Sequence, residues 1–401
     1  MNLDADRIAG PEVPRSEIDW RMRRLRESLS ARSLSAVLAV QRVEVLYFAG
    51  TPQDGIVWIP REGEPVFLVR RDVERARRES PLSRVTPFSR PGDIPAALAE
   101  HGIRIDGPVG TSLDVLPVKL HQSLQRALGV AIEDVSREVR GTRAVKSVWE
   151  RARVRDAGVL ADAIFAFARD CLRPGLREID LAGELDRFLV QSGSVTFYRT
   201  RTFNLQFETL CCIAGESGDW RGPGDSPNSA GRGPDPAFGQ GPSARELRPG
   251  EPILVDLGTN RGGYYADTTR IFHFGTLPRR FADAHRTSEE ILVHAVEDLE
   301  RGCPLQDVYE GAVGRARAAG LGEAFMGGSR FLGHGVGLEI DEWPVVAGDV
   351  KEPLSEGAVV SLEPKFALPG GIVGVETTFI LEGGRMHPVV TFPTAPTRVD
   401  G

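Results

Sequence analysis

Two apolar segments in the C-terminal half of this 401-residue chain carry acidic residues where a β-hairpin is expected. The β-rich run 253–258 contains Asp256, and a second β-rich run, 264–272, contains Asp267 after the turn sequence NRGG. Asn and Gly between two such runs are a strong hairpin signal. A turn centred on residues 261–262 would place Asp256 directly opposite Asp267 on the paired strands.

A second hairpin with the same arrangement is expected further along the chain. Residues 359–363 end in Glu363, the turn sequence LPGG comes shortly afterwards, and residues 372–376 end in Glu376. A turn centred on residues 369–370 places Glu363 opposite Glu376. Each hairpin therefore puts two carboxylates side by side on neighbouring strands.

Carboxylates paired in this way constrain the fold strongly, because they repel one another. Like charges directly opposite each other destabilise a sheet, since their Cβ atoms lie only about 5 Å apart. Two converging pairs either have raised pKa values or bind a cation. His334 lies between glycines in the sequence FLGHGVG and can add one nitrogen ligand.

Four carboxylates and one imidazole can hold two divalent ions at a shared centre, with the ions about 3.5–4 Å apart. We expect Mn²⁺ or Co²⁺ first, with Zn²⁺ or Fe²⁺ as alternatives. Each of the five residues alone has a structural explanation, such as an edge-strand aspartate or a hydrogen-bonded core histidine. Their ordered occurrence, with two consistent hairpin registers, favours the metal centre.

The ordered Asp, Asp, His, Glu and Glu residues, with the phrases VDLG, ADTTR, GHGVGLE, SLEP and GVETT, resemble the superfamily of aminopeptidase P, prolidase, methionine aminopeptidase and creatinase. The resemblance implies an α+β protein. Its C-terminal catalytic domain would have the pita-bread fold, and its smaller N-terminal domain would be an α/β domain of the creatinase type. The phrases LYFAG and AVKSVWE extend the resemblance to both domains. Methionine aminopeptidases lack the extra domain, so the Xaa-Pro peptidase branch is the better match.

We place the N-terminal domain at residues 1–142 and the catalytic domain at residues 143–401. Helical spacing of apolar residues between Ile18 and Leu29, followed by short apolar runs, predicts an α/β layer in the first domain. The Gly- and Pro-rich stretch 215–244 leads directly into the first hairpin. We expect it to form a lid or rim over the metal site, with a disordered insertion as the alternative.

The resemblance also implies roles for the five residues. Asp256 and Glu376 would bridge the two ions, and Asp267 would bind mainly one of them. His334 and Glu363 would bind the other ion. Glu363 would also be catalytic, because it would accept the proton of the water that bridges the ions.

The chain departs from the proline-specific peptidases at two histidines that normally contact the substrate. Those proteins carry a second histidine seven residues after the ligand histidine, and Asp341 stands at that position here. The other histidine precedes the first metal-binding strand, yet no histidine lies between His121 and His273. Asp341 can serve as the catalytic acid or base instead, or it can simply hydrogen-bond a backbone amide or an arginine.

The leading functional hypothesis is a dinuclear Xaa-Pro peptidase, of the aminopeptidase P or prolidase type, that acts on proline-containing peptides. We expect Arg201, Tyr265 and Glu342 to contact the substrate. A metal-dependent lyase similar to dimethylsulfoniopropionate lyases is one alternative, because those proteins share the fold and use an aspartate as base. A non-catalytic peptide-binding scaffold is another, although such relatives typically lose metal ligands.

Composition argues against several other partners. The net charge of −7 disfavours nucleic acid or an anionic membrane as the main partner. No apolar run approaches the roughly 20 residues of a membrane-spanning helix. The polar residues 1–15 contain no signal-peptide core, and the four cysteines show no paired spacing, so we expect a cytoplasmic protein. The family resemblance implies a homodimer.

Overall fold

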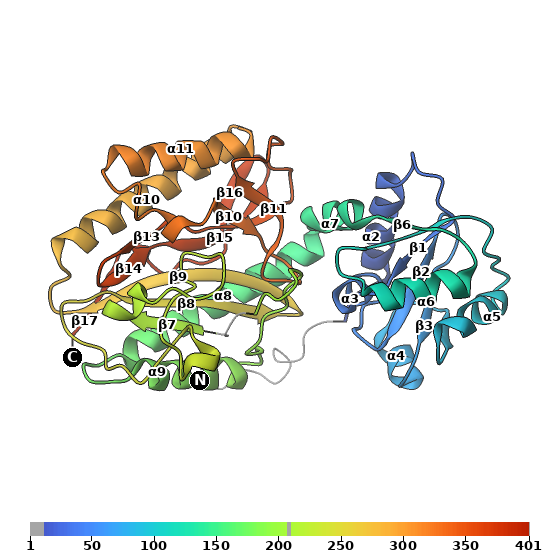
Figure 1. Ribbon diagram of the computed structural model, residues 1–401, viewed down its shortest axis with the longest axis horizontal. Coiled ribbons are helices and arrows are strands. Elements are labelled where there is room, and N and C mark those ends of the chain that lie inside the picture. The colour runs from blue at the N-terminus through green and yellow to red at the C-terminus, as the bar shows by residue number, and fades with distance from the viewer. Residues whose placement is uncertain (1–11, 207–209, 401) are drawn as a thin grey trace. The chain divides into compact units, whose positions relative to one another are not determined.

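The computed structural model describes residues 12–206 and 210–400 (Figure 1). These residues form two compact units, 12–143 and 144–400. Among the described residues, none of the helices combines the length and the apolar character that a membrane span needs.

The N-terminal unit contains a mixed β-sheet, in which the described strands pair in the order β4-β3-β2-β1-β5-β6. The strands are β1 (Ala36–Ala39), β2 (Gly55–Pro60), β3 (Val66–Val69), β4 (Val85–Pro87), β5 (Val109–Thr111) and β6 (Ile132–Asp134). The helices are α2 (Arg15–Ser28), α3 (Arg42–Ala49), α4 (Val73–Glu79), α5 (Ile94–Ala99), α6 (Val118–Leu128) and α7 (Ser136–Ala144), with the 3₁₀ turn η1 (Pro91–Asp93).

The predicted α/β layer is therefore present in this unit. Ile18, Met22 and Leu25 follow one another at helical spacing and are at most 2% exposed, so one face of α2 is buried. Burial of this apolar face supplies most of the stability of such a helix, because isolated helices of this length are marginal in water.

The larger unit contains a β-sheet whose main path runs β11-β10-β12-β15-β9-β8-β7, and β16 and β17 pair with β15 and β9 respectively. These strands are β7 (Leu210–Ala214), β8 (Ile253–Arg261), β9 (Tyr264–Phe274), β10 (Phe331–Gly335), β11 (Glu342–Ala347), β12 (Val359–Leu362), β15 (Glu376–Glu382), β16 (Arg385–Pro388) and β17 (Thr397–Val399). A separate two-stranded sheet joins β13 (Lys365–Leu368) to β14 (Gly371–Gly374).

Two pairs of helices pack on these sheets. The pairs are α8 (Val148–Cys171) with α9 (Glu178–Gln191), and α10 (Arg279–Glu300) with α11 (Leu305–Ala318), and the 3₁₀ turns are η2 (Gly215–Asp219), η3 (Pro236–Phe238) and η4 (Met326–Gly328). Within this unit α8 and α9 pack against β7 to β9, whereas α10 and α11 pack against β10, β11, β13 and β14 (Figure 1). Helix α8 begins at a reciprocal cap between Ser147 and Glu150, in which each side chain accepts from the other's backbone N–H.

The first hairpin has a different register from the one predicted. Gly262 and Gly263 have φ of 55° and 88°, and a two-residue hairpin turn with positive φ at both positions favours Gly there. The turn is therefore centred on residues 262–263, one position further along the chain than predicted. Asp256 lies opposite Thr269 rather than Asp267 as a result. Because a displacement by two preserves the alternation of side chains, both aspartates still point to the same face of the sheet.

The second hairpin follows the predicted register. Leu362 pairs with Thr377 in β12 and β15, and Lys365 pairs with Gly374 in β13 and β14. Glu363 and Glu376 lie between these two pairs. Counting along both strands from either pair leads to Glu363 opposite Glu376, which is the predicted register. The hairpin thus continues through the two glutamates while its strands move from one sheet to the other.

Candidate metal centre

The five predicted metal ligands come from neighbouring strands in the middle of the large sheet. In sheet order, His334 lies on β10, Glu363 follows β12, Glu376 begins β15, Asp267 lies on β9 and Asp256 lies on β8. Each is at most 9% exposed. Residues far apart in sequence are brought together because these strands are hydrogen-bonded neighbours.

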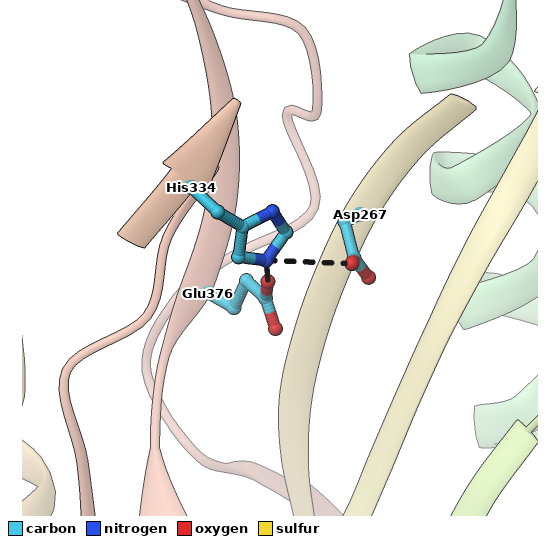
Figure 2. A group of neighbouring side chains, drawn as sticks. All are labelled: Asp267, His334 and Glu376. Atoms are coloured by element: carbon cyan, nitrogen blue, oxygen red, sulfur yellow. Dashed lines mark ion pairs between the residues drawn. The ribbon is translucent and has the colours of Figure 1, made fainter. Parts of the chain in front are cut away.

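Three of these side chains form one compact group of donor atoms, Asp267, His334 and Glu376 (Figure 2). The Nε2 atom of His334 lies 3.9 Å from Asp267 Oδ2, 3.9 Å from Glu376 Oε1 and 3.7 Å from Glu363 Oε1. Oxygen and imidazole donors bind divalent ions at about 2.0–2.2 Å, so donors of one ion lie within about 4.4 Å of each other. Nε2 and one carboxylate oxygen each from Asp267 and Glu376 therefore form the candidate ligand set of one divalent ion, and Glu363 Oε1 lies next to this set.

The imidazole of His334 is held so that Nε2 faces the carboxylates. Its Nδ1 atom lies 3.1 Å from the carbonyl oxygen of Gly335 and 3.2 Å from Asp341 Oδ1. A metal-binding histidine usually donates its second ring N–H to such an oxygen, which fixes both tautomer and orientation. Asp341 therefore contacts a predicted ligand directly, and its predicted role as catalytic acid or base stays a prediction.

Hydroxyl groups beside the carboxylates fix their orientation. Ser361 Oγ donates to Glu376 Oε1 over 3.0 Å, and Thr269 Oγ1 lies 2.9 Å from Glu376 Oε2 and in hydrogen-bond contact with Asp256. Thr269 occupies the position opposite Asp256 on β9, so the actual register places a neutral donor where the predicted register placed a second charge.

A buried lysine that sequence reasoning missed completes the cluster. Lys365 Nζ lies 3.0 Å from Asp256 Oδ2, 2.7 Å from Glu363 Oε2 and 2.6 Å from Glu376 Oε2. Its side chain is fully buried. Lys365 follows Glu363 by two positions, which is the spacing that places side chains on one face of a strand.

Burial and mutual repulsion perturb the titration of these groups when no ion is bound. Burial raises the pKa of Glu363 to about 8 and of Asp256 to about 6, and it raises the pKa of Asp267 well above its usual range. Burial opposes the ionisation of Glu376 also, but Lys365 and His334 outweigh it and lower that pKa to about 2. The four carboxylates therefore need more positive charge than the protein supplies, which is the condition a divalent ion satisfies.

Metal binding to this site must release protons. Burial would lower the pKa of His334, but the surrounding carboxylates outweigh it and raise that pKa to about 10 in the ion-free site. A metal ligand must be the neutral imidazole, so the ion displaces a proton from His334 and another from Glu363. Apparent Mn²⁺ affinity should rise about tenfold per pH unit for each displaced proton between pH 6 and 8. Calorimetry in two buffers of different ionisation enthalpy measures both quantities, and a pH-independent affinity without proton release would contradict this prediction.

The cluster lines a cavity that also receives residues from the stretch 215–244. Asp225, Ser226, Asn228 and Gln240 are part of its wall. Asn228 Oδ1 lies 3.4 Å from Lys365 Nζ, so this stretch reaches the floor of the site. The side chain of Asp341 lines the cavity as well.

The three expected substrate contacts stay predictions, and the Tyr265 ring packs edge-to-face against the ring of Tyr198 in the cavity wall. Arg201, Tyr265 and Glu342 do not line the cavity. The hydroxyl of Tyr265 donates to the carbonyl oxygen of Phe197 over 2.9 Å, and Glu342 Oε1 accepts from the backbone N–H of Glu339 over 3.0 Å. Glu342 Oε2 also lies 3.5 Å from Lys146 Nζ, so both side chains have protein partners.

Tyr198 also contributes to the cavity wall. Its hydroxyl accepts a hydrogen bond from the backbone N–H of Gly258 over 2.5 Å. Gly258 lies opposite Asp267, and a Cβ atom at this glycine would lie 2.8 Å from the Tyr198 ring. The glycine in the phrase VDLG therefore allows the ring to pack beside the aspartate.

The sequence profile of Metallopeptidase family M24 matches residues 152–382, which is more than half of the chain. The chain belongs to metallopeptidase family M24. The profile of the creatinase/prolidase N-terminal domain matches residues 21–145 of this M24 protein. The family resemblance of the motifs is thus confirmed.

Curated relatives of this M24 protein include peptidases. A Xaa-Pro dipeptidase of Lactobacillus helveticus is 29% identical over 238 residues, which are 59% of this chain and 57% of that protein. The match thus spans little more than half of the relative's length. A probable dipeptidase PepE of Mycobacterium bovis is 29% identical over 318 residues, which are 78% of this chain and 76% of the relative.

Solved structures confirm the predicted two-domain pita-bread fold class. A Xaa-Pro dipeptidase from Bacillus anthracis matches with a TM-score of 0.80 at 22% identity, over 95% of this chain and 99% of that one. The N-terminal domain of the FACT complex subunit SPT16 from chickpea matches with a TM-score of 0.68 at 14% identity, over 95% and 97% of the two chains. Because one fold can host different functions, the reaction must be argued from the site.

Proposed function

We propose that this M24 protein is a metal-dependent Xaa-Pro peptidase, which hydrolyses the peptide bond before proline with a metal-activated water. The observation that carries the proposal is the group of donor atoms from Asp267, His334 and Glu376 in one cavity, with the Glu363 carboxylate beside His334. Relatives described as Xaa-Pro dipeptidases support the substrate class. Mn²⁺ or Co²⁺ is the proposed ion, because carboxylate-rich sites with one imidazole suit these metals.

A divalent ion bound by these residues would supply a water of lowered pKa and polarise the scissile carbonyl. Glu363 would accept the proton of that water, and the 3.7 Å between its Oε1 atom and His334 Nε2 supports this role. It would then deliver the proton to the amine leaving group. Lys365 and Ser361 hold the Glu363 and Glu376 carboxylates in place, so the proton acceptor is preorganised.

The expectation of two ions stays a prediction, because Lys365 competes for the same carboxylates. A homodimer and a cytoplasmic location also stay predictions.

The proposed function is tested with purified protein, loaded with Mn²⁺ or Co²⁺ and compared with the chelated protein. Xaa-Pro dipeptides, longer Xaa-Pro peptides and matched Xaa-Ala peptides are the substrates, and released amino acids are quantified. We expect metal-dependent cleavage before proline and little cleavage before alanine. Dimethylsulfoniopropionate is included as a further substrate. If this compound alone is turned over, the protein is a lyase and the proposed peptidase function is wrong.

A further inference from the structure

We propose that the ammonium group of Lys365 occupies the position of a second divalent ion, so that this M24 protein binds one ion per chain. The inference rests on the metal dependence proposed above and concerns the number of ions that the carboxylates hold. It departs from the two-ion centre expected from the motifs.

Both glutamates of the cluster divide their two oxygens between two positive groups. Glu363 Oε1 lies 3.7 Å from His334 Nε2, while its Oε2 lies 2.7 Å from Lys365 Nζ. Glu376 repeats this division, with Oε1 3.9 Å from Nε2 and Oε2 2.6 Å from Nζ. A carboxylate that bridges two cations directs one oxygen to each of them. Here Oε2 of each glutamate contacts the lysine ammonium group, and Oε1 faces the ion-binding side beside His334.

The remaining ligand falls on the lysine side of the site. Asp256 Oδ2 lies 3.0 Å from Lys365 Nζ, whereas the compact donor group contains Asp267, His334 and Glu376 without Asp256 (Figure 2). The cluster is therefore divided into an ion-binding half around His334 and an ammonium half around Lys365.

A second ion and the lysine head compete directly. Metal ions bind carboxylate oxygens at about 2.0–2.2 Å, and an ion on the oxygens of Asp256, Glu363 and Glu376 would use the lone pairs that now accept from Nζ. The two positive charges would also be in contact. Because the Lys365 side chain is fully buried, its ammonium group would have to be displaced within the protein to admit the ion.

The composition of the chain and the packing around position 365 both favour a lysine at this position. Only four lysines occur in the chain, at positions 119, 146, 351 and 365, and the other basic residues among its 49 Lys and Arg are arginines. Lysine differs from arginine because its charge is compact and carries three donors that can rotate, which suits three carboxylates around one point. Gly374 lies opposite Lys365, where a Cβ atom would lie 2.6 Å from the lysine Cα and 2.8 Å from its Cγ.

The test measures metal content directly. Wild-type protein is saturated with Mn²⁺, freed of excess ion by gel filtration and analysed by mass spectrometry, and electron paramagnetic resonance reports whether ions are paired. We expect about one Mn²⁺ per chain and the six-line spectrum of an isolated ion. Two ions per chain with an exchange-coupled spectrum would overturn the inference, whatever the peptidase assay shows.

A variant pair tests the role of the lysine itself. Lys365→Ala removes the ammonium group and opens its space, so Mn²⁺ content should rise from one to two per chain. Lys351→Ala, at an exposed lysine outside the site, should keep the wild-type content. A folded Lys365→Ala variant that still binds one ion would overturn the inference, while the wild-type count decides the question if that variant does not fold. Absence of any bound ion in the wild type would overturn both the inference and the proposed metal-dependent function, whereas two ions with intact peptidase activity would overturn the inference alone.

Discussion

Replacing Glu363 by glutamine is expected to lower kcat for an Xaa-Pro dipeptide by about 10²–10⁴-fold, the usual contribution of a positioned proton acceptor. Glutamine keeps the size of the side chain and one carbonyl oxygen that can bind an ion, but it cannot take a proton from water. In the ion-free site burial raises the pKa of Glu363 to about 8, so its carboxylate takes up a proton more readily than an exposed glutamate does. Steady-state kinetics at saturating Mn²⁺, with metal content measured on the same sample, separate lost proton transfer from lost metal.

Glu382→Gln provides a matched control for this substitution. Glu382 ends β15, the strand that Glu376 begins, but it pairs with Arg151 and Arg155 and is partly exposed. We expect its kcat to stay within about twofold of the wild type, since surface substitutions away from special sites have small effects. A Glu363→Gln variant that keeps its ion and its full kcat would show that another group accepts the proton.

The fold could be predicted from sequence because its evidence is local. Apolar residues at helical spacing identify α2, and hydrophobic runs bounded by Gly and Pro identify the hairpins that carry the carboxylates. The predicted register of the first hairpin was wrong because its turn is formed by Gly262 and Gly263, not by Arg261 and Gly262. The error left both aspartates on the correct face, since side chains alternate with a period of two.

Lys365 was missed for a different reason. Nothing in the local sequence shows that its ammonium group meets Asp256 and Glu376 from other strands. The stretch 215–244 was expected near the site, but the individual contacts of Asn228 and Tyr198 depend on irregular segments whose path is set by tertiary packing. Tyr265 was expected to contact substrate, but its hydroxyl donates to the carbonyl oxygen of Phe197, a partner far away in sequence that only the tertiary fold identifies.

The lysine changes how the site is stabilised before any ion arrives. Buried carboxylates that face one another destabilise the folded state unless a positive charge lies among them. Lys365 supplies that charge permanently, and its carboxylate contacts outweigh burial and raise the pKa of its ammonium group well above the usual value. Removal of the lysine should therefore be most damaging when metal is absent.

In the presence of EDTA, Lys365→Ala is expected to lower the free energy of unfolding by about 3–5 kcal/mol, the usual effect of removing one partner of a buried ion pair. Asp256, Glu363 and Glu376 would then face one another without the lysine. Saturating Mn²⁺ should recover most of this loss, because an ion that binds only the folded state stabilises it in proportion to the logarithm of its concentration over Kd. Urea unfolding followed by circular dichroism, with and without Mn²⁺, measures both effects.

Lys351→Ala is the control for this measurement, since its exposed side chain predicts a change of less than about 0.5 kcal/mol in either condition. An equal loss for Lys365→Ala in EDTA and in Mn²⁺ would mean that the lysine contributes through packing of its aliphatic stem. A loss confined to EDTA would mean that a metal ion can replace the ammonium group. That exchange requires the two cations to share one position among the same three carboxylates, so stability and metal content must change together in this variant.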